Sequence, residues 1–215
     1  MSERLTRALV LLTALLTTAL LVSPAGASAP GESSPPGGAA AEPPLSDRLA
    51  AGEDRATWVW TRPKPRKLVR FAQREGARDL FLHVPPGFDK SPDRRWVRRV
   101  AALARPSGLR LHALGGDPRW TTRPAAAVAW QRDVLASGLF RRVHVDIEPW
   151  GLPRWDTHQR RLLAAYLRTL RALRDAGDGV RLEADVPFWF PGLRTRGGTP
   201  LDDAVLRIVD AVTVM

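Results

Sequence analysis

Short apolar runs alternate with longer segments of helical periodicity along residues 55–215. Runs of four to seven residues rich in β-branched and aromatic side chains predict strands over 57–60, 79–84, 109–114, 142–148, 180–186 and 211–215. Segments whose apolar residues recur every three or four positions predict helices over 65–75, 93–104, 124–135, 157–176 and 201–208. This alternation of strand and helix predicts parallel βαβ units.

The number and order of these elements predict an α/β fold of the (β/α)8 TIM-barrel type. A complete barrel of this type takes about 250 residues. Six strand–helix units in the 161 residues of 55–215 correspond to an incomplete barrel. No glycine-rich nucleotide motif follows any predicted strand, which disfavours a doubly wound nucleotide fold. Because the chain ends at Met215 inside a predicted strand, we expect the barrel domain to be truncated at its C-terminus.

The first 54 residues read as a targeting segment followed by a linker. Two arginines precede an apolar stretch over 8–22, and small residues at 25–27 suit cleavage, which is the order of a secretory signal peptide. The apolar stretch is shorter than the roughly 20 residues that a membrane span needs. We expect a signal peptide over 1–27, a disordered Pro/Gly/Ala/Ser-rich leader over 28–54, secretion, and no stable membrane association after cleavage.

The fourth predicted strand has one apolar and one polar face. Val143, Val145 and Ile147 alternate with polar residues and are expected to face the helices. The polar residues of this strand and of its neighbours are expected to point into the barrel: His83, His112, His144, Asp146, Glu148, Glu183 and Asp185. Active sites of TIM barrels form at the C-terminal ends of the strands, and this is where Asp146 and Glu148 fall.

Asp146 and Glu148 have a spacing that suits acid catalysis. Two carboxyl groups separated by one residue on a strand lie about 6–7 Å apart, from two rises of ~3.3 Å. Like charges this close raise one pKa and keep a proton available for a general acid. Cleavage of a glycosidic bond needs one acid for the leaving oxygen and one group that stabilises the oxocarbenium-like centre. The alternative for these residues is a structural ion pair with Arg or His of a neighbouring strand.

Aromatic residues follow several predicted strands and are expected to share the mouth of the barrel. Trp60 ends the first strand, Trp120 follows the third, Trp150 follows the fourth and Trp189 follows the fifth. Aromatic faces at a barrel mouth can stack on the apolar C–H faces of sugar rings. We expect these four Trp residues and Asp185 to line a substrate site, with packing inside the loops as the alternative for each ring.

The fourth-strand sequence VHVDIEPW resembles the catalytic strand of glycoside hydrolase family 18, the chitinases and related enzymes. That family carries D-x-x-D-x-D-x-E at the end of the fourth barrel strand, and its last two acids fall on Asp146 and Glu148. The resemblance implies that Glu148 is the general acid and that Asp146 orients a substrate N-acetyl group as the internal nucleophile. The two upstream Asp positions are Arg141 and His144 here, and Met215 matches the Met of the family's Met-x-Tyr at strand six.

The amino-acid composition excludes several classes of protein and of functional site. A hydrophobic fraction of 44% and a charged fraction of 26% are typical of a globular domain. The absence of cysteine excludes a disulfide scaffold, a Cys-zinc site and a thiol nucleophile. The net charge of +11 comes from Arg and Lys in almost every segment, with no recognised nucleic-acid motif. We interpret this charge as solvated surface and expect no nucleic-acid partner.

The favoured hypothesis is a secreted glycoside hydrolase-like protein that cleaves an extracellular polysaccharide by general acid catalysis from Glu148, with Asp146 stabilising the reacting centre. The hypothesis requires no cofactor and no metal. One alternative is a non-catalytic glycan-binding barrel, which the altered motif supports. Another is a metal-dependent hydrolase using His83, His112 and His144 with Asp185. His144 lies four residues below Glu148, roughly 13 Å deeper by strand rise, which disfavours a metal cluster at one level.

Overall fold

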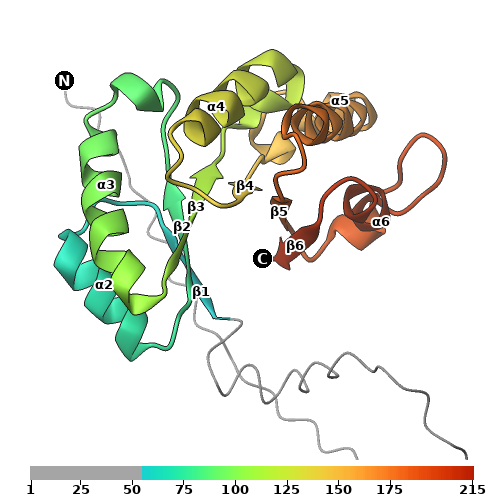
Figure 1. Cartoon of the computed structure of the whole chain (residues 1–215). Helices are drawn as coiled ribbons and strands as arrows, with labels where there is room; N and C mark the ends of the chain where they lie inside the picture. The colour runs from blue at the N-terminus through green and yellow to red at the C-terminus, as the bar shows by residue number, and fades with distance from the viewer. Residues whose placement is uncertain (1–54) are drawn as a thin grey trace, which may run out of the picture. The chain divides into compact units, whose positions relative to one another are not determined.

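The computed structural model describes residues 55–215, and these fold around one six-stranded parallel sheet (Figure 1). The strands run in chain order across the sheet, with each strand paired to the next. They are β1 (Ala56–Val59), β2 (Asp79–His83), β3 (Arg110–Gly115), β4 (Val143–Val145), β5 (Leu182–Val186) and β6 (Ala211–Val214). The order β1-β2-β3-β4-β5-β6 with parallel pairing is the order of strands in a TIM barrel.

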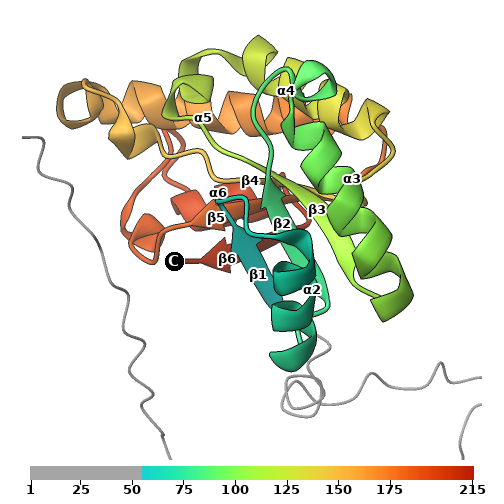
Figure 2. The ribbon, with the colours of Figure 1, turned by 90° about the vertical axis from the view of Figure 1, so that its left-hand side faces the viewer.

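Helices connect successive strands and cover one face of the sheet (Figure 2). They are α2 (Pro65–Arg74), α3 (Asp93–Ala104), α4 (Pro124–Ala136), α5 (Trp155–Ala176) and α6 (Leu201–Leu206). Pro65 and Pro124 occupy the first helical positions of α2 and α4, where the missing N–H costs no hydrogen bond. Short 3₁₀ helices follow the strands in most of the connecting loops. The predicted α/β fold of the TIM-barrel type, with six of its eight strands, is therefore confirmed.

The alternation of residues along the strands separates a core from an inner face. Val143, Val145 and Ile147 are almost fully buried in the hydrophobic core between sheet and helices. Leu170 and Leu173 of α5 lie in the same core and are fully buried. Burying each such side chain contributes roughly 1.5–3 kcal/mol. Because successive side chains of a strand point to opposite faces, the polar residues of β4 and β5 are held on the inner face.

The fourth strand is shorter than the sequence pattern predicts. Regular pairing ends at Val145, and residues 146–148 continue as extended chain into a 3₁₀ turn at Pro149–Gly151. The N–H of Asp146 still donates a 2.9 Å hydrogen bond to the carbonyl of Gly115. Asp146 is thereby anchored to β3, whereas Glu148 lies on the loop that leaves the strand. The two acids occupy the C-terminal end of the sheet, where active sites of this fold form.

The predicted signal peptide (1–27) and leader (28–54) lie outside the described residues. Within residues 55–215, no helix combines the length and the apolar character that a membrane crossing requires.

Candidate functional site

The inner face of the sheet carries a layer of aromatic and imidazole rings. Trp58 stacks on Phe81 with ring centroids 5.1 Å apart, and Phe81 lies 4.7 Å from the ring of His144 and 5.0 Å from that of His112. His112 and His144 are both fully buried. The predicted inward orientation of these two histidines agrees with this layer, which forms the floor beneath the strand ends.

An ion-pair network fixes the β2–β3 part of the layer. The side chain of Asp79 accepts hydrogen bonds of 2.8 and 2.7 Å from the guanidinium of Arg110 and contacts the Nε2 of His112. Burial raises the pKa of Asp79, but the bonds from His112 and Arg110 outweigh burial and hold it well below its usual range. Sequence reasoning missed this role of Asp79, because a strand-initial Asp carries no pattern that names its partners.

A second network joins β4 to β5. The Nε2 atom of His144 lies 2.9 Å from Oδ1 of Asp185, and its Nδ1 atom lies 3.6 Å from Oε2 of Glu183. Burial alone lowers the pKa of His144, but the contacts with Asp185 and Glu183 outweigh burial and raise it. All three side chains are more than 90% buried. Both ring nitrogens of His144 therefore lie near carboxylate oxygens of β5, in contacts that lack the geometry of a hydrogen bond.

Glu183 is also held by two arginines. Arg181 and Arg142 reach the Oε1 atom of Glu183 at 2.7 and 3.0 Å. Burial raises the pKa of Glu183, but the interactions with His144, Arg181 and Arg142 outweigh it and lower the pKa to about 2. Glu183 is thus a structural carboxylate. A structural ion pair with Arg and His, the alternative given for Asp146 and Glu148, is found at Glu183.

Three carboxyl groups lie at the strand ends above this network. The register pairs His144 with Glu183 and Val145 with Ala184, so the next step places Asp146 beside Asp185. Burial, then the charges of Asp185 and Glu148, raise the pKa of Asp146 to about 7, and His144 offsets part of this rise. Burial and the charge of Asp185 also raise the pKa of Glu148. The buried Oδ1 of Asp146 has no hydrogen-bond partner among the described residues.

Two consecutive glycines allow β3 to approach this site closely. A Cβ on Gly116 would collide with the backbone carbonyl oxygen of Asp146, and a Cβ on Gly115 would collide with the indole ring of Trp130. Neither glycine has a positive φ, so close approach is the reason for glycine here. Gly116 therefore sets the position of the backbone that carries Asp146.

The aromatic residues after β4 and β5 form a cluster that packs against the hydrophobic core. Trp150 and Trp189 meet edge to face at 5.1 Å between ring centroids, and Trp155 meets Trp189 at 6.2 Å. Phe190 is fully buried beneath Trp150 and Trp189. The structure thus brings Trp150 and Trp189 together, and both keep part of their surface exposed; that they line a substrate site stays a prediction.

The remaining two predicted aromatic residues, Trp60 and Trp120, differ in how much of each side chain is exposed. Trp60 is 47% exposed at the end of β1 and lies 5.2 Å from the ring of His83. Trp120 is only 4% exposed because it packs in the core against Trp130, with ring centroids 5.1 Å apart. The prediction that Trp120 lines a substrate site is therefore corrected: its ring faces the core and supports the loop after β3.

Tyr166 lies in the helix predicted over 157–176 and was not among the predicted site residues. It is 1% exposed, and its hydroxyl has no hydrogen-bond partner among the described residues. Burial and the charges of Asp146 and Asp185 raise its pKa. A tyrosine inside a leucine-rich helical pattern was the only available signal, and that pattern equally fits a core residue.

The metal-site alternative requires three ligands that converge. In the described part of the chain, no three His, Asp or Glu side chains are arranged to hold a metal ion. His83 lies at the mouth beside Trp60, whereas His112 and His144 are buried and each contacts carboxylates. The three histidines therefore have different neighbours and do not converge on one point.

The parallel strand order and the acids at the carboxyl ends of β4 and β5 define a TIM-type barrel with an acidic site. No protein-family model matches the chain, and the comparison with curated proteins gives no match. Solved structures do match. A chitinase from Chromobacterium violaceum ATCC 12472 aligns with a TM-score of 0.52 at 10% identity, over 74% of this chain and 54% of that one.

A class V chitinase from Nicotiana tobaccum, solved as a glutamate-to-glutamine mutant in complex with NAG4, aligns with a TM-score of 0.51 at 14% identity. This match covers 75% of the present chain and 51% of the chitinase. The chain therefore has a chitinase-like barrel fold and spans about half the length of these structures. At these identities the likeness establishes the fold.

Proposed function

We propose that this protein is a secreted glycoside hydrolase that cleaves an extracellular polysaccharide, with Glu148 as the general acid and Asp146 as the group that stabilises the reacting centre. The observation that carries the proposal is the cluster of Asp146, Glu148 and Asp185 at the ends of β4 and β5. Two of these three carboxyl groups have raised pKa values, about 7 for Asp146. A raised pKa helps a carboxyl group to keep the proton that cleavage of a glycosidic bond needs.

Glu148 is the acid because it lies furthest toward the mouth and is partly exposed. Its carboxyl group donates a proton to the glycosidic oxygen as the bond to the anomeric carbon breaks. Water then adds to the anomeric carbon and returns a proton to the Glu148 carboxylate, which completes the hydrolysis. Asp146, held more deeply, stabilises in its ionised form the positive charge that develops on the sugar ring. The charge of Asp185 raises the pKa of Asp146, and Asp185 in turn lies 2.9 Å from the Nε2 atom of His144. Asp185 thus supplies the second carboxylate that position 144 lacks relative to the family motif.

Trp150 and Trp189 extend the proposed site, because their partly exposed rings lie on the loops that follow the two acid-bearing strands. Aromatic faces there would stack on sugar rings on either side of the scissile bond. Trp60 offers a third exposed ring at the end of β1. The fold match to two chitinases, one of them in complex with NAG4, supports a polysaccharide as the substrate class.

The proposal is tested by counting new reducing ends after incubation with chitin, peptidoglycan and galactosaminoglycans. We expect release by the wild type and a loss of about 10²–10⁴-fold in Glu148→Gln, the range that a general acid contributes. Asp156→Asn on the exposed start of α5 is the matched control and should retain activity. Folded wild-type protein that releases no reducing ends from any polysaccharide would refute the proposal.

A non-catalytic glycan-binding barrel is the second candidate, because His144 replaces an acid of the family motif. This candidate predicts saccharide affinity that is unchanged in Glu148→Gln, with no turnover by either protein. Calorimetric titration with chitin oligosaccharides, run beside the reducing-end assay, separates the two functions. A large loss of turnover with retained affinity supports the hydrolase.

Secretion belongs to the same proposal and rests on the signal-peptide pattern of residues 1–27. Expression of the full chain should deliver protein to the culture medium that begins at residue 28. Mass spectrometry of the intact secreted protein measures this. Protein retained in the cell pellet with residues 1–27 attached would contradict secretion by cleavage.

A further inference from the structure

A strongly basic surface covers α2 and α3, on the opposite side of the sheet from the carboxyl groups. Residues 62–107 contain thirteen Lys or Arg and four Asp or Glu, a formal charge of +9. Residues 108–215 contain sixteen Lys or Arg and twelve Asp or Glu, a formal charge of +4, although this segment is more than twice as long. Basic residues thus occur in almost every segment, but within the described residues the net positive charge concentrates over two neighbouring helices.

We define the basic face as the exposed Lys and Arg residues of these helices and the loops that lead into them. They are Lys64, Arg66, Lys67, Arg70, Lys90, Arg95, Arg98 and Arg99. The three lysines among them are all the lysines in the chain. None of the eight forms an ion pair with any of residues 55–215, whereas the nearby Arg62 and Arg94 pair with Asp93 and Asp89 at 2.7 Å.

The spacing of these residues keeps their charges close together. Arg66 and Arg70 on α2, and Arg95 and Arg99 on α3, are each four residues apart and so lie on one side of their helix. Like charges at this spacing repel one another, and no acidic side chain of residues 55–215 forms an ion pair with them. An anionic ligand would relieve this repulsion, which gives the face charge complementarity to a polyanion.

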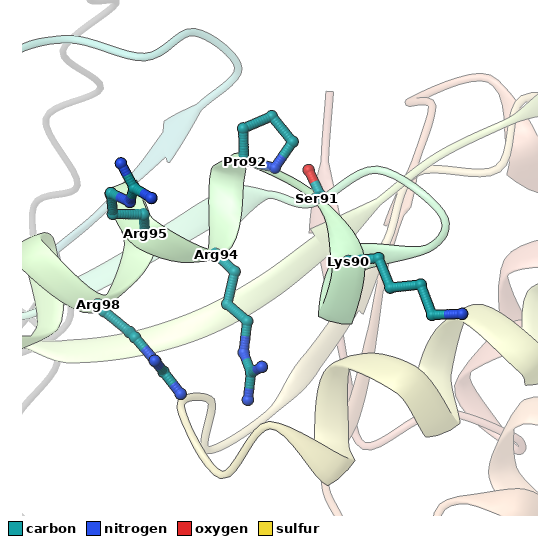
Figure 3. A pocket seen from close by; sticks show the side chains of 6 residues that line it. All are labelled: Lys90, Ser91, Pro92, Arg94, Arg95 and Arg98. Carbon is teal, nitrogen blue, oxygen red and sulfur yellow. The ribbon is translucent and has the colours of Figure 1, made fainter.

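The surface is also hollowed where these charges lie. A hollow of about 580 Å³ is lined by residues of both α2 and α3, including Arg66, Arg70 and Arg99, with Leu103 as an apolar contact. A second hollow of about 530 Å³ lies at the start of α3, where Arg94 and Arg98 extend in the same direction (Figure 3). Guanidinium groups can hold carboxylate or phosphate oxygens in pairs, so both hollows suit anionic groups.

We propose that the basic face binds an anionic polysaccharide, a polymer that repeats carboxylate, phosphate or sulfate groups along its length. The choice of a polysaccharide rests on the proposed function. α2 and α3 begin directly after the loops that leave β1 and β2, so the face starts at the end of the barrel that carries Glu148. One long polymer can therefore occupy the face and reach the carboxyl site, which holds the protein next to its substrate.

The test is calorimetric titration of the folded protein with polygalacturonate in 0.15 M salt, with dextran as the uncharged control polymer. A triple variant, Arg66→Gln, Arg70→Gln and Arg99→Gln, removes charge from the first hollow. Exposed arginines without ion pairs to residues 55–215 provide the matched control on α5: Arg160→Gln, Arg168→Gln and Arg171→Gln. We expect binding to polygalacturonate that weakens tenfold or more in the first variant and less than twofold in the control, and that falls steeply with salt.

Three outcomes would overturn the inference. The first is no binding to polygalacturonate, and the second is an equal loss of affinity in both triple variants. The third is tighter binding to duplex DNA than to a polygalacturonate chain that carries the same number of negative charges. The last would assign the face to nucleic acid. Wild type that binds polygalacturonate but hydrolyses no polysaccharide would refute the proposed hydrolase while supporting the binding face.

Discussion

His144 and Asp185 are joined across neighbouring strands, with 2.9 Å between the Nε2 atom of the imidazole and an Oδ1 carboxylate oxygen. The contact is buried, and it lies directly below the proposed acid site. It keeps the Asp185 side chain beside Asp146, whose pKa rises to about 7 partly because of the Asp185 charge. The buried contact between His144 and Asp185 thus influences the pKa of Asp146, which lies above it.

Replacing Asp185 by Asn removes this charge and should lower the pKa values of both Asp146 and Glu148. Burial also contributes to both, so the pKa of Asp146 should fall without reaching its ordinary value. Carbon-13 NMR titration of the side-chain carboxyl groups measures the change. Asp203→Asn, at an exposed position of α6, is the control and should leave the pKa values of Asp146 and Glu148 unchanged. An unchanged Asp146 titration in Asp185→Asn would disprove the coupling.

Asp146 should make the protein less stable as the pH rises. Its folded-state pKa of about 7 lies above the ordinary value of 3.8, so the folded protein holds the proton more tightly. The free energy of unfolding therefore falls between about pH 4 and pH 7, as Asp146 loses its proton in a buried site. Asp146→Asn keeps the shape and removes the charge, so it should be more stable than the wild type at pH 8.

The expected gain is about 1–2 kcal/mol at pH 8, because partial exposure reduces the full effect of the pKa shift. For a domain of this size that corresponds to a rise of roughly 2–8 °C in Tm. Thermal unfolding followed by circular dichroism at pH 5 and pH 8 measures it, and the gain should shrink at pH 5. An equal gain at both pH values would assign the effect to packing instead of charge.

Glu183 has the opposite dependence on pH. Its pKa of about 2 lies below the ordinary value of 4.5, so its contribution is complete above pH 4.5 and is lost as the pH falls toward 2. Glu183→Gln should cost about 3 kcal/mol at pH 7, since His144, Arg142 and Arg181 lose a charged partner. Urea unfolding of wild type and variant at pH 7 and pH 3 measures this. The difference should narrow at the lower pH.

Much of the fold follows from the two-residue period of the strands and the 3.6-residue period of the helices in the sequence. Val143, Val145 and Ile147 alternate with polar residues, and this alternation correctly predicted the two faces of β4. The partners of the polar residues were not predictable, because Arg181 and Arg142 meet Glu183 only through strand register and side-chain reach. A periodic pattern identifies the face of a strand; it does not identify which charge on the next strand lies opposite.

The error at Trp120 has a related physical reason. A tryptophan in a loop after a strand occupies the right place in the chain for a ligand contact. Its burial depends on whether a neighbouring helix covers the loop, and here α5 does so: the Oγ1 atom of Thr169 donates a 2.9 Å hydrogen bond to the Trp120 carbonyl. The sequence predicted the position of the loop. It did not predict that α5 packs over the loop, which only the structure shows.

Gly116→Ala should disturb the proposed site without changing any charged residue. The added Cβ would collide with the Asp146 carbonyl oxygen, which belongs to backbone and cannot move aside as a flexible side chain can. Overpacking of this kind costs typically 1–3 kcal/mol, and a displacement of about 1 Å at a reacting group can reduce the rate 10²-fold. Both Tm and kcat should therefore fall in Gly116→Ala.

Gly192→Ala provides the matched control, because Gly192 is exposed, lacks a positive φ, and has open space where a Cβ would go. It should retain the Tm and the activity of the wild type. Measuring turnover well below the Tm of each variant separates displacement of Asp146 from simple loss of folded protein. If Gly116→Ala lowered Tm but kept full kcat, the position of Asp146 would not matter for the reaction, and its role at the reacting centre would have to be abandoned.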